Sequence, residues 1–205
     1  MVLTRLIVVR HGETVWNLEE KLQGQLDSEL TPLGIAQSGA LAERLSRCTI
    51  RALYSSDLGR ARQTAESIAA RTGQQIRFEP RLRERHLGIF QGRTWPQVQQ
   101  LFPEDMARFL SNDVDYVVPE GESFSQSSAR IIGCLEELAR AHAGQQIGIV
   151  SHGAVLGAVL RHVLGISPKT PRRFKRLNGS WNVFTFDHGE WFLETWGDIS
   201  HLQTV

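Results

Sequence analysis

Short apolar runs alternate with amphipathic stretches along most of the chain, and this pattern predicts strands that alternate with helices. The clearest apolar runs are Leu6–Val9 and 147–150, and each is followed directly by polar residues and a glycine. Continuous apolar runs of this length are typical of strands that are buried on both faces of a parallel sheet. Two further short strands are expected at 52–55 and 75–78.

The stretches between these strands carry helix signals. Thr31-Pro32 places an N-cap residue before a proline in the first helical position, which is a common way to begin a helix. Ser56-Asp57 is expected to cap a helix that carries Arg60 and Arg62. Longer helices are expected at 95–110, 124–143 and 154–164.

The last apolar segments predict a hairpin. Strand-like stretches at 183–186 and 191–195 are joined by Asp187-His188-Gly189-Glu190, a turn sequence. The aromatic residues of these strands are expected to pack in the core rather than to stack on nucleic-acid bases. The whole pattern predicts an α/β fold, in which a mostly parallel central sheet is flanked by helices and carries an antiparallel hairpin at its edge.

The composition fits one globular domain that spans residues 1–205. The chain is 41% hydrophobic and 22% charged. Lys and Arg total 23 against 22 Asp and Glu, a formal net charge of +1, so the overall charge favours neither a nucleic-acid nor a membrane surface. The helix and strand pattern weakens at about 88–122, and we expect this segment to be an insertion that covers the substrate.

The two cysteines, Cys48 and Cys134, are too few for a disulfide framework and are expected in helices as small buried residues. The first residues lead into a strand without a secretory-signal pattern, and no apolar stretch is long enough to span a bilayer. These features predict a cytoplasmic protein with no membrane partner.

The polar residues directly after two predicted strands are the first candidates for chemistry. Arg10-His11-Gly12 follows the first strand, and Ser151-His152-Gly153 follows the strand at 147–150. Open α/β sheets build their sites at the carboxyl ends of strands, so the two imidazoles are expected to face one pocket. Arginine can donate two parallel hydrogen bonds to phosphate oxygens, and histidine can act as a nucleophile, acid or base near neutral pH.

More polar candidates lie after the other predicted elements. They are Arg60 in the first turn of the helix after 52–55, Glu84 after 75–78, and Asn17, Gln23 and Gly24 after the first motif. With these motifs in this order, essentially the whole chain resembles the histidine phosphatase superfamily, also called the phosphoglycerate mutase-like family.

The resemblance implies a role for each matching residue. His11 matches the phosphate-accepting histidine, His152 the second histidine, Glu84 the acid, Arg10 and Arg60 the arginines that clamp phosphate, and Arg85 a substrate-binding arginine of the mutases. Asn17 and Gln23 match polar positions that contact the phosphoryl group in several small-molecule phosphatases. Together with Gly24 and Arg85, they are expected to bind substrate. The implied partner is a small phosphorylated metabolite.

The implied reaction is metal-independent hydrolysis of a small phosphomonoester through a phosphohistidine intermediate on His11. Phosphoryl transfer depends mainly on positioning and electrostatic stabilisation, which Arg10 and Arg60 would supply. Glu84 must be protonated to donate to the leaving oxygen, and as a carboxylate it can then activate water. The alternative for Glu84 is a structural salt bridge with a neighbouring arginine.

Metal catalysis is the rival chemistry, because the chain contains seven histidines. Their spacing matches neither the HExxH motif nor paired cysteine ligands, and an arginine beside His11 would repel a cation. We therefore expect no metal and no cofactor. His162 and His201 are expected to be surface or structural residues, and Arg62 a solvated one.

Two other functions stay open. The first is a phosphoglycerate mutase. The mutases that the chain resembles carry a pair of adjacent arginines in a long insertion after the acid motif. In this chain the corresponding stretch, 93–120, contains two separate arginines, Arg93 and Arg108, and no adjacent pair. Arg172-Arg173 follows the second histidine motif, too late in the chain to match that pair, although the fold could still bring it to the pocket. The second is a non-catalytic regulatory protein that recognises phosphate, which the intact set of motifs argues against.

The identity of the substrate is open. The candidates are phosphosugars, phosphoserine, phosphoglycerates, the nucleotide-loop phosphates of cobalamin synthesis and phosphohistidine on a protein. The oligomeric state is equally open.

Overall fold

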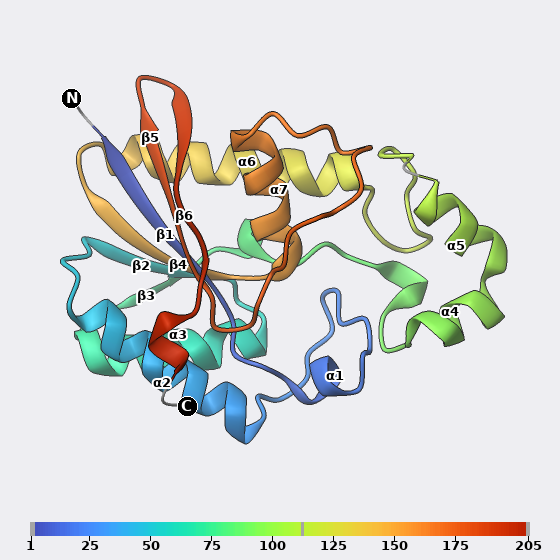
Figure 1. The fold of residues 1–205 in the computed structure, drawn as a ribbon, viewed down its shortest axis with the longest axis horizontal. Coiled ribbons are helices and arrows are strands. Elements are labelled where there is room, and N and C mark those ends of the chain that lie inside the picture. Colours follow the sequence, from blue (N-terminus) through green and yellow to red (C-terminus); the bar gives the residue numbers. More distant parts are fainter. Residues whose placement is uncertain (1–2, 112, 204–205) are drawn as a thin grey trace.

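The computed structural model describes residues 3–111 and 113–203, and its centre is a six-stranded sheet with the order β3-β2-β4-β1-β5-β6 (Figure 1). The strands are β1 (Thr4–Arg10), β2 (Ala52–Ser55), β3 (Ile76–Phe78), β4 (Gln146–Ser151), β5 (Trp181–Asp187) and β6 (Glu190–Asp198). The pairs β1–β4, β2–β4 and β2–β3 are parallel, whereas β5 runs antiparallel to β1 and β6. The predicted α/β class with an antiparallel hairpin at the edge is confirmed.

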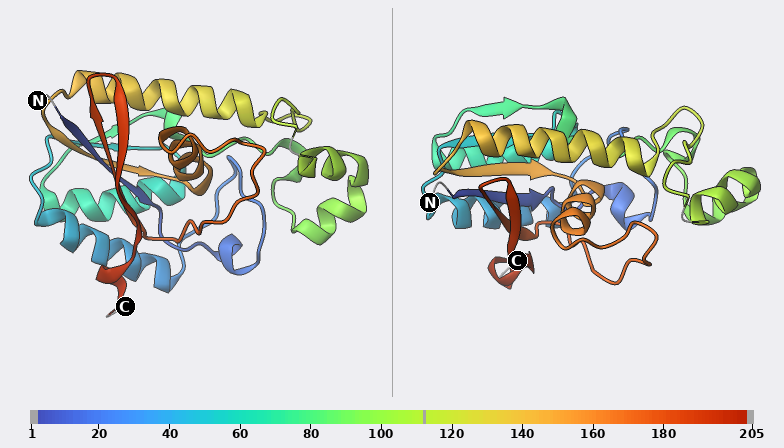
Figure 2. Two further views of the ribbon diagram at one scale, coloured as in Figure 1. Left: turned by 45° about the horizontal axis from the view of Figure 1, so that its top comes forward. Right: turned by 90° about the horizontal axis from the view of Figure 1, so that it is seen from above.

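Helices cover both faces of this sheet (Figures 1 and 2). They are α1 (Val15–Leu18), α2 (Pro32–Ser46), α3 (Gly59–Thr72), α4 (Trp95–Leu101), α5 (Pro103–Leu110), α6 (Phe124–Ala141) and α7 (Gly153–Val163), with short 3₁₀ helices η1 (Pro80–Leu82), η2 (Gly88–Phe90) and η3 (Ser200–Leu202). Within β1, Leu6 and Val8 pack toward α6 and α7, whereas Ile7 and Val9 pack toward α2 and α3. This alternation follows the two-residue period of a strand, and burial on both faces explains the continuous apolar run.

The register of β1 and β4 brings the two His-Gly motifs together. Arg10 at the end of β1 is paired with Ser151 at the end of β4. The next residue, His11, donates its backbone N–H to the Ser151 oxygen at 3.0 Å. The neighbouring parallel strands therefore end at the same level, and His11 and His152 follow them at the carboxyl edge of the sheet.

The segment 88–122 carries α4 and α5 away from the strand ends (Figures 1 and 2). It has a small core of its own, formed by Phe90, Val98, Met106, Tyr116 and Val118. The segment leaves and rejoins the rest of the chain at a narrow neck, where the Ile89 N–H bonds to the Pro119 oxygen at 3.0 Å. Gly88 has a φ of 46°, and a Cβ there would lie 1.9 Å from the Pro119 oxygen, so the neck requires glycine.

Two helix predictions were wrong in detail. The helix expected at 95–110 is divided into α4 and α5 at Phe102-Pro103, because proline lacks an N–H and disfavours helical backbone at the residue before it. Helix α3 begins after Leu58, which makes no side-chain cap, rather than after Ser56-Asp57. The other predicted strands and helices are confirmed to within a few residues at each end.

The cysteine prediction holds for one residue of the two. Cys134 is buried within α6, as expected. Cys48 is half-buried and lies beyond the end of α2 rather than inside it. None of the helices in the described part of the chain is long and apolar enough to cross a membrane.

Candidate active site

His11 is buried at the end of β1, with only 2% of its surface exposed. Its Nδ1 lies 2.7 Å from the Gly12 carbonyl, so Nδ1 carries the proton and Nε2 keeps a lone pair. The Arg60 Nε donates to this Nε2 at 3.3 Å. Burial lowers the pKa of His11 well below its ordinary value, and the nearby Arg60 and Arg10 charges lower it further. The ring is therefore neutral, as a nucleophile requires.

Gly12, which follows His11, allows the backbone after β1 to pack closely against α2. A Cβ at Gly12 would lie 2.3 Å from the Gly34 oxygen, so the turn after β1 packs directly on the first turn of α2. The turn is also bonded to α3, because the Gly12 N–H donates to the Thr64 hydroxyl at 3.1 Å. These contacts fix the backbone that carries His11.

His152 lies beside His11, with the two ring centroids 5.2 Å apart and the ring planes inclined by 57°. It is the N-cap residue of α7, but its side chain makes no capping bond. Its Nε2 instead lies 2.8 Å from the Ser56 hydroxyl, and its Nδ1 is buried without a partner among the described residues. Burial, helped by Arg60, lowers the pKa of His152 well below its ordinary value. A neutral ring with a spare polar atom can contact a phosphoryl oxygen.

Arg60 is the most tightly held cation of the site, with 1% of its surface exposed. Its terminal nitrogens donate to the Gly24 and Leu26 carbonyls, both at 2.8 Å. It also pairs with Asp27 at 3.0 Å. Gly24, expected to bind substrate, thus orients Arg60 through its carbonyl and lines the cavity itself.

Arg10 points from the end of β1 toward the start of α7. One terminal nitrogen donates to the Arg176 carbonyl, and its Nε is buried without a partner among the described residues. Burial, together with the charge of Arg176, lowers the pKa of Arg10 to about 10, so it remains a cation at neutral pH. Arg10 and Arg60 both line the same cavity as His11.

The Glu84 carboxylate lies at the N-terminus of α7. Its two oxygens accept from the Ala154 N–H at 3.0 and 3.2 Å, and one accepts from the Arg85 N–H at 2.7 Å. Among the described residues Glu84 forms no salt bridge, since Arg83 pairs instead with Asp57 at 2.5 Å. The structural alternative for Glu84 therefore has no support here, and its carboxylate lines the cavity.

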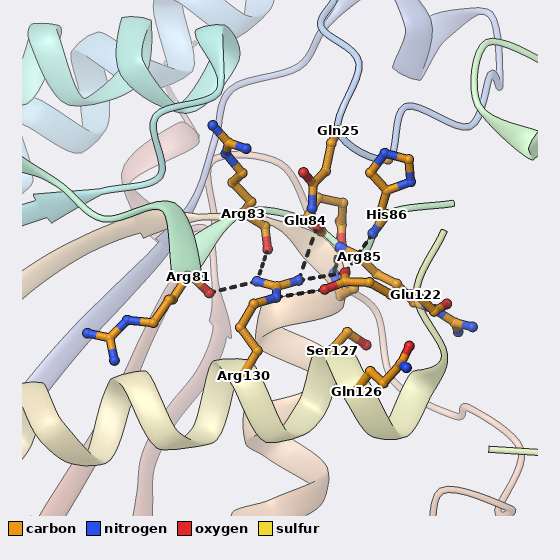
Figure 3. Close-up of polar contacts among 12 residues, drawn as sticks. Gln25, Arg81, Arg83, Glu84, Arg85, His86, Glu122, Gln126, Ser127 and Arg130 are labelled. Atoms are coloured by element: carbon orange, nitrogen blue, oxygen red, sulfur yellow. Dashed lines mark hydrogen bonds and ion pairs between the residues drawn. The ribbon is translucent and has the colours of Figure 1, made fainter. Parts of the chain in front are cut away.

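The backbone of the acid segment is held by a half-buried ion pair between Arg130 and Glu122 (Figure 3). Arg130 on α6 donates to the carbonyls of Arg81 at 2.7 Å and Arg83 at 3.1 Å. The same guanidinium binds both carboxylate oxygens of Glu122, at 2.8 and 2.9 Å. Glu122 in turn accepts from the His86 N–H at 2.9 Å, so this ion pair connects α6 to both sides of Glu84.

The remaining candidates also line the cavity. Asn17, Gln23 and Arg85 are all among its lining residues. The Gln23 amide nitrogen donates to Thr14 at 2.8 Å, which leaves its buried oxygen without a partner among the described residues. The Arg85 guanidinium donates to the Glu122 carbonyl at 3.1 Å and lies 5.0 Å from the Phe109 ring centre. All nine predicted site residues therefore meet at one cavity or, like His152, directly behind it.

The cavity has a volume of about 550 Å³, which is ample for a small metabolite. Its floor is formed by His11 and Arg60, which line the cavity, together with His152 directly behind His11. One wall comes from the segment 88–122 and is mainly apolar, with Trp95, Phe109 and Tyr116. The other wall is basic and comes from α7 and the loop that follows it, with Arg161, Arg172 and Arg176.

Three relevant residues were missed in the sequence. Arg176 and Asn178 lie in the loop before β5, and the Asn178 amide donates to the His11 carbonyl and the Asn17 oxygen, both at 3.1 Å. Arg130 is one of several polar residues on α6. Neither group follows a strand end, so no local pattern distinguished these residues. Of the residues set aside, Arg62 and His162 are exposed as expected, and His201 is half-buried and bonded to the Gly179 carbonyl at 2.9 Å.

The fold and the site define a histidine phosphatase. The family model described as histidine phosphatase superfamily (branch 1) matches residues 6–199, and the chain therefore belongs to that superfamily.

Individual relatives agree with this assignment. The chain is 38% identical to a metal-independent phosphoserine phosphatase of Arabidopsis thaliana, over 99% of this chain and 85% of that protein. It is 41% identical to phosphoglycerate mutase-like protein 4 of the same plant, over 97% of this chain and 86% of that protein. A mutant phosphoserine phosphatase of Entamoeba histolytica, solved in complex with phosphoserine, superposes with a TM-score of 0.87 at 31% identity, over 97% of this chain and 99% of that one. The chain is thus similar to both phosphatases and mutase-like proteins.

Proposed function

We propose that the protein is a metal-independent phosphatase that hydrolyses a small phosphomonoester through a phosphohistidine on His11. One observation carries the proposal. A neutral His11 presents its unprotonated Nε2 to the Arg60 guanidinium at 3.3 Å, in a cavity that Glu84 also lines. A nucleophile, a permanent cation and a proton carrier are the parts that phosphoryl transfer requires.

In the first step, the His11 Nε2 attacks phosphorus in line with the leaving oxygen. An N–P bond forms and the P–O bond to the leaving group breaks. Arg10 and Arg60 neutralise the phosphoryl oxygens, and the spare nitrogen of His152 contacts one of them. Glu84, protonated in this step, donates its proton to the leaving oxygen, and an alcohol departs.

In the second step, the Glu84 carboxylate takes a proton from water as the water attacks phosphorus. The N–P bond breaks, inorganic phosphate leaves, and His11 and protonated Glu84 are restored. The Ala154 and Arg85 N–H groups hold the carboxylate in place through both steps. The same group thus acts first as an acid and then as a base.

The intermediate can be tested directly. Enzyme quenched during turnover of a radiolabelled phosphomonoester should carry a phosphoryl group that acid removes and base does not. Activity toward a generic aryl phosphate should also survive exhaustive treatment with EDTA. Loss of activity on chelation, restored by a divalent ion, would contradict the metal-independent mechanism.

A phosphoglycerate mutase is the second candidate, favoured by the mutase-like relative and by Arg85 in the cavity. A mutase must hold a bisphosphorylated intermediate while it reorients. Of the arginines in 93–120, Arg93 bonds to the Ile89 carbonyl at 2.7 Å and Arg108 stacks on Tyr116, and neither lines the cavity. We therefore expect hydrolysis to dominate.

The two reactions can be separated in one assay. The protein is mixed with 3-phosphoglycerate and a trace of 2,3-bisphosphoglycerate, and 2-phosphoglycerate and free phosphate are followed together. Phosphate should be released faster than 2-phosphoglycerate forms. The opposite order would establish the mutase reaction instead.

A further inference from the structure

The cavity holds more positive charge than one phosphoryl group neutralises. Two acidic residues line it, Glu84 and Asp113. The basic residues that line it are Arg10, Lys21, Arg60, Arg85, Arg161, Arg172 and Arg176. A bound phosphate dianion would offset the two arginines nearest to His11, and the basic wall would remain uncompensated.

The arginines of the basic wall have no acidic partner of their own. Within residues 3–111 and 113–203, none of Arg161, Arg172 and Arg176 forms a salt bridge, whereas Arg60 on the floor of the same cavity pairs with Asp27 at 3.0 Å. Arg161 donates only to the carbonyls of Ser167 and Thr170, both at 2.7 Å, and so holds the loop that carries the other two. Grouping like charges without counterions is costly, which indicates that an anion completes the group.

Arg176 connects this wall to the phosphoryl site. Its terminal nitrogen donates to the Gly153 carbonyl at 2.9 Å, and its Nε is buried without a partner among the described residues. A Cβ at Gly153 would lie 3.5 Å from the Arg10 Nε and 3.8 Å from the Arg176 Cζ, so the two guanidinium groups lie side by side over the first turn of α7. Burial lowers the pKa of Arg176, and the positive charges of Arg172 and Arg161 lower it further, while the negative charge of Glu84 raises it.

We propose that Arg172 and Arg176 form a second anion subsite beside the phosphoryl site, and that the substrate carries a second acidic group, a carboxylate or a phosphate, which binds there. This proposal rests on the phosphatase reaction proposed above for the floor of the same cavity. The opposite wall is mainly apolar, with Trp95, Phe109 and Tyr116, and its one guanidinium, that of Arg85, lies over the Phe109 ring and donates to the Glu122 carbonyl. The larger group of arginines therefore lies on the loop side, and a second acidic group is directed there. The substrate is thus a small phosphomonoester that carries one further acidic group, rather than a phosphosugar or phosphoalcohol whose only charged group is the phosphate that is removed.

Matched substrates test the subsite. 3-Phosphoglycerate and glycerol 3-phosphate have the same three-carbon chain and differ at one end by a carboxylate in place of a hydroxymethyl group. Fructose 1,6-bisphosphate and fructose 6-phosphate differ by a second phosphate. In at least one pair, kcat/KM should be about tenfold or more higher for the doubly acidic member, as expected for a charge-assisted hydrogen bond. Preference in the first pair identifies a carboxylate, and preference in the second a phosphate.

Two variants locate the effect. Arg172→Gln, at an exposed position, should lower this preference about tenfold. Arg173→Gln removes the same charge from the adjacent exposed residue, which does not line the cavity, and should leave the preference unchanged. Equal loss in both variants would show a general effect of charge and would overturn the subsite, as would no preference in the unaltered protein.

A binding measurement separates this proposal from the proposed reaction. The four ligands are titrated by calorimetry into the His11→Asn variant, which cannot form the phosphohistidine. Tighter binding of the doubly acidic members, weakened by adding Arg172→Gln, would support the subsite even if no phosphomonoester were hydrolysed. Equal binding within both pairs would reject the subsite even if aryl phosphate turnover had established the phosphatase.

Discussion

The floor and the walls of the cavity are built in different ways. On the floor, His11, His152 and Arg60 each expose at most 2% of their surface. They follow strand ends or lie in the first turn of a helix packed on the sheet, and they bond both to backbone carbonyls and to the side chains of Ser56 and Asp27. The geometry of the floor is therefore set by the strand ends together with the loop at 24–27 that holds Arg60.

The walls are attached more loosely. Trp95 exposes 38% of its surface, and Arg172 is exposed. The apolar wall belongs to a segment with its own core, and the basic wall to an irregular loop held by side-chain hydrogen bonds, such as those of Arg161 and Arg176. The contrast indicates that the chemistry is fixed by the fold whereas selectivity resides on parts that can vary independently. Changes to the floor should therefore alter catalysis for every substrate, and changes to the walls should alter preference among substrates.

The largest effect is expected from removing the nucleophile on the floor. His11→Ala should abolish the phosphoryl label and lower kcat by about 10⁴-fold or more on every substrate. His162→Ala, an exposed histidine on α7, is the matched control and should have full activity. Retained turnover in the His11 variant would reject the assignment of the nucleophile.

The second effect concerns the acid. Glu84→Gln preserves size but cannot donate a proton, so hydrolysis of alkyl phosphates should fall by about 10²–10⁴-fold. Aryl phosphates should be affected far less, because their leaving group departs without protonation. The exposed Glu190→Gln serves as the control in the same kinetic comparison. Equal losses on both substrate classes would show that Glu84 is not the general acid.

The two buried imidazoles predict how stability depends on pH. The pKa values of His11 and His152 are lowered in the folded state, so below the unfolded-state pKa of about 6.5 the unfolded chain binds protons that the folded one does not. Their contribution to stability is complete above that pH and is lost as the pH falls. The free energy of unfolding should decrease by up to about 1.4 kcal/mol per pH unit for each ring, with a smaller share from His201, whose pKa is also lowered.

Urea titrations between pH 7.5 and 5 would measure this slope above the range in which most carboxylates titrate. Replacing both His11 and His152 by Asn should flatten it, and replacing the exposed His162 should not. An unchanged slope in the double variant would show that other groups cause the pH dependence.

A smaller effect is expected where the floor meets the walls. Arg130→Gln releases the backbone around Glu84 without touching substrate, so alkyl phosphate hydrolysis should fall about tenfold more than aryl phosphate hydrolysis. Arg130→Lys should recover part of the loss, because one charge and some donors remain. Arg140→Gln, which breaks only an exposed pair with Glu136 on the same helix, is the control. A loss without dependence on the leaving group would indicate destabilisation rather than positioning of the acid.

The sequence predicts the floor well because its residues follow directly from strand ends. The apolar run before Arg10-His11 predicts the strand, and the end of the run predicts that Arg10 and His11 lie at the carboxyl edge of the sheet. The register that unites His11 with His152 could be expected only in outline, since strand order depends on packing across the whole sheet.

The walls and their supports were harder to predict. Arg176 and Asn178 reach the site through a long irregular loop, and such a loop has no hydrophobic period to place its side chains. Arg130 acts through carbonyl groups that lie far from it in sequence. At Phe102-Pro103 the helical pattern continues across a break that one proline imposes.

The narrow neck at Gly88 has a consequence for how the protein can evolve. Because the chain enters and leaves the segment 88–122 at neighbouring points, the segment can lengthen, shorten or be exchanged with little extra loop-closure entropy. The strands on either side would keep their places, and so would the catalytic groups. A substrate range could therefore be inherited or engineered as a separate piece of sequence, by grafting a relative's segment between Leu87 and Glu122.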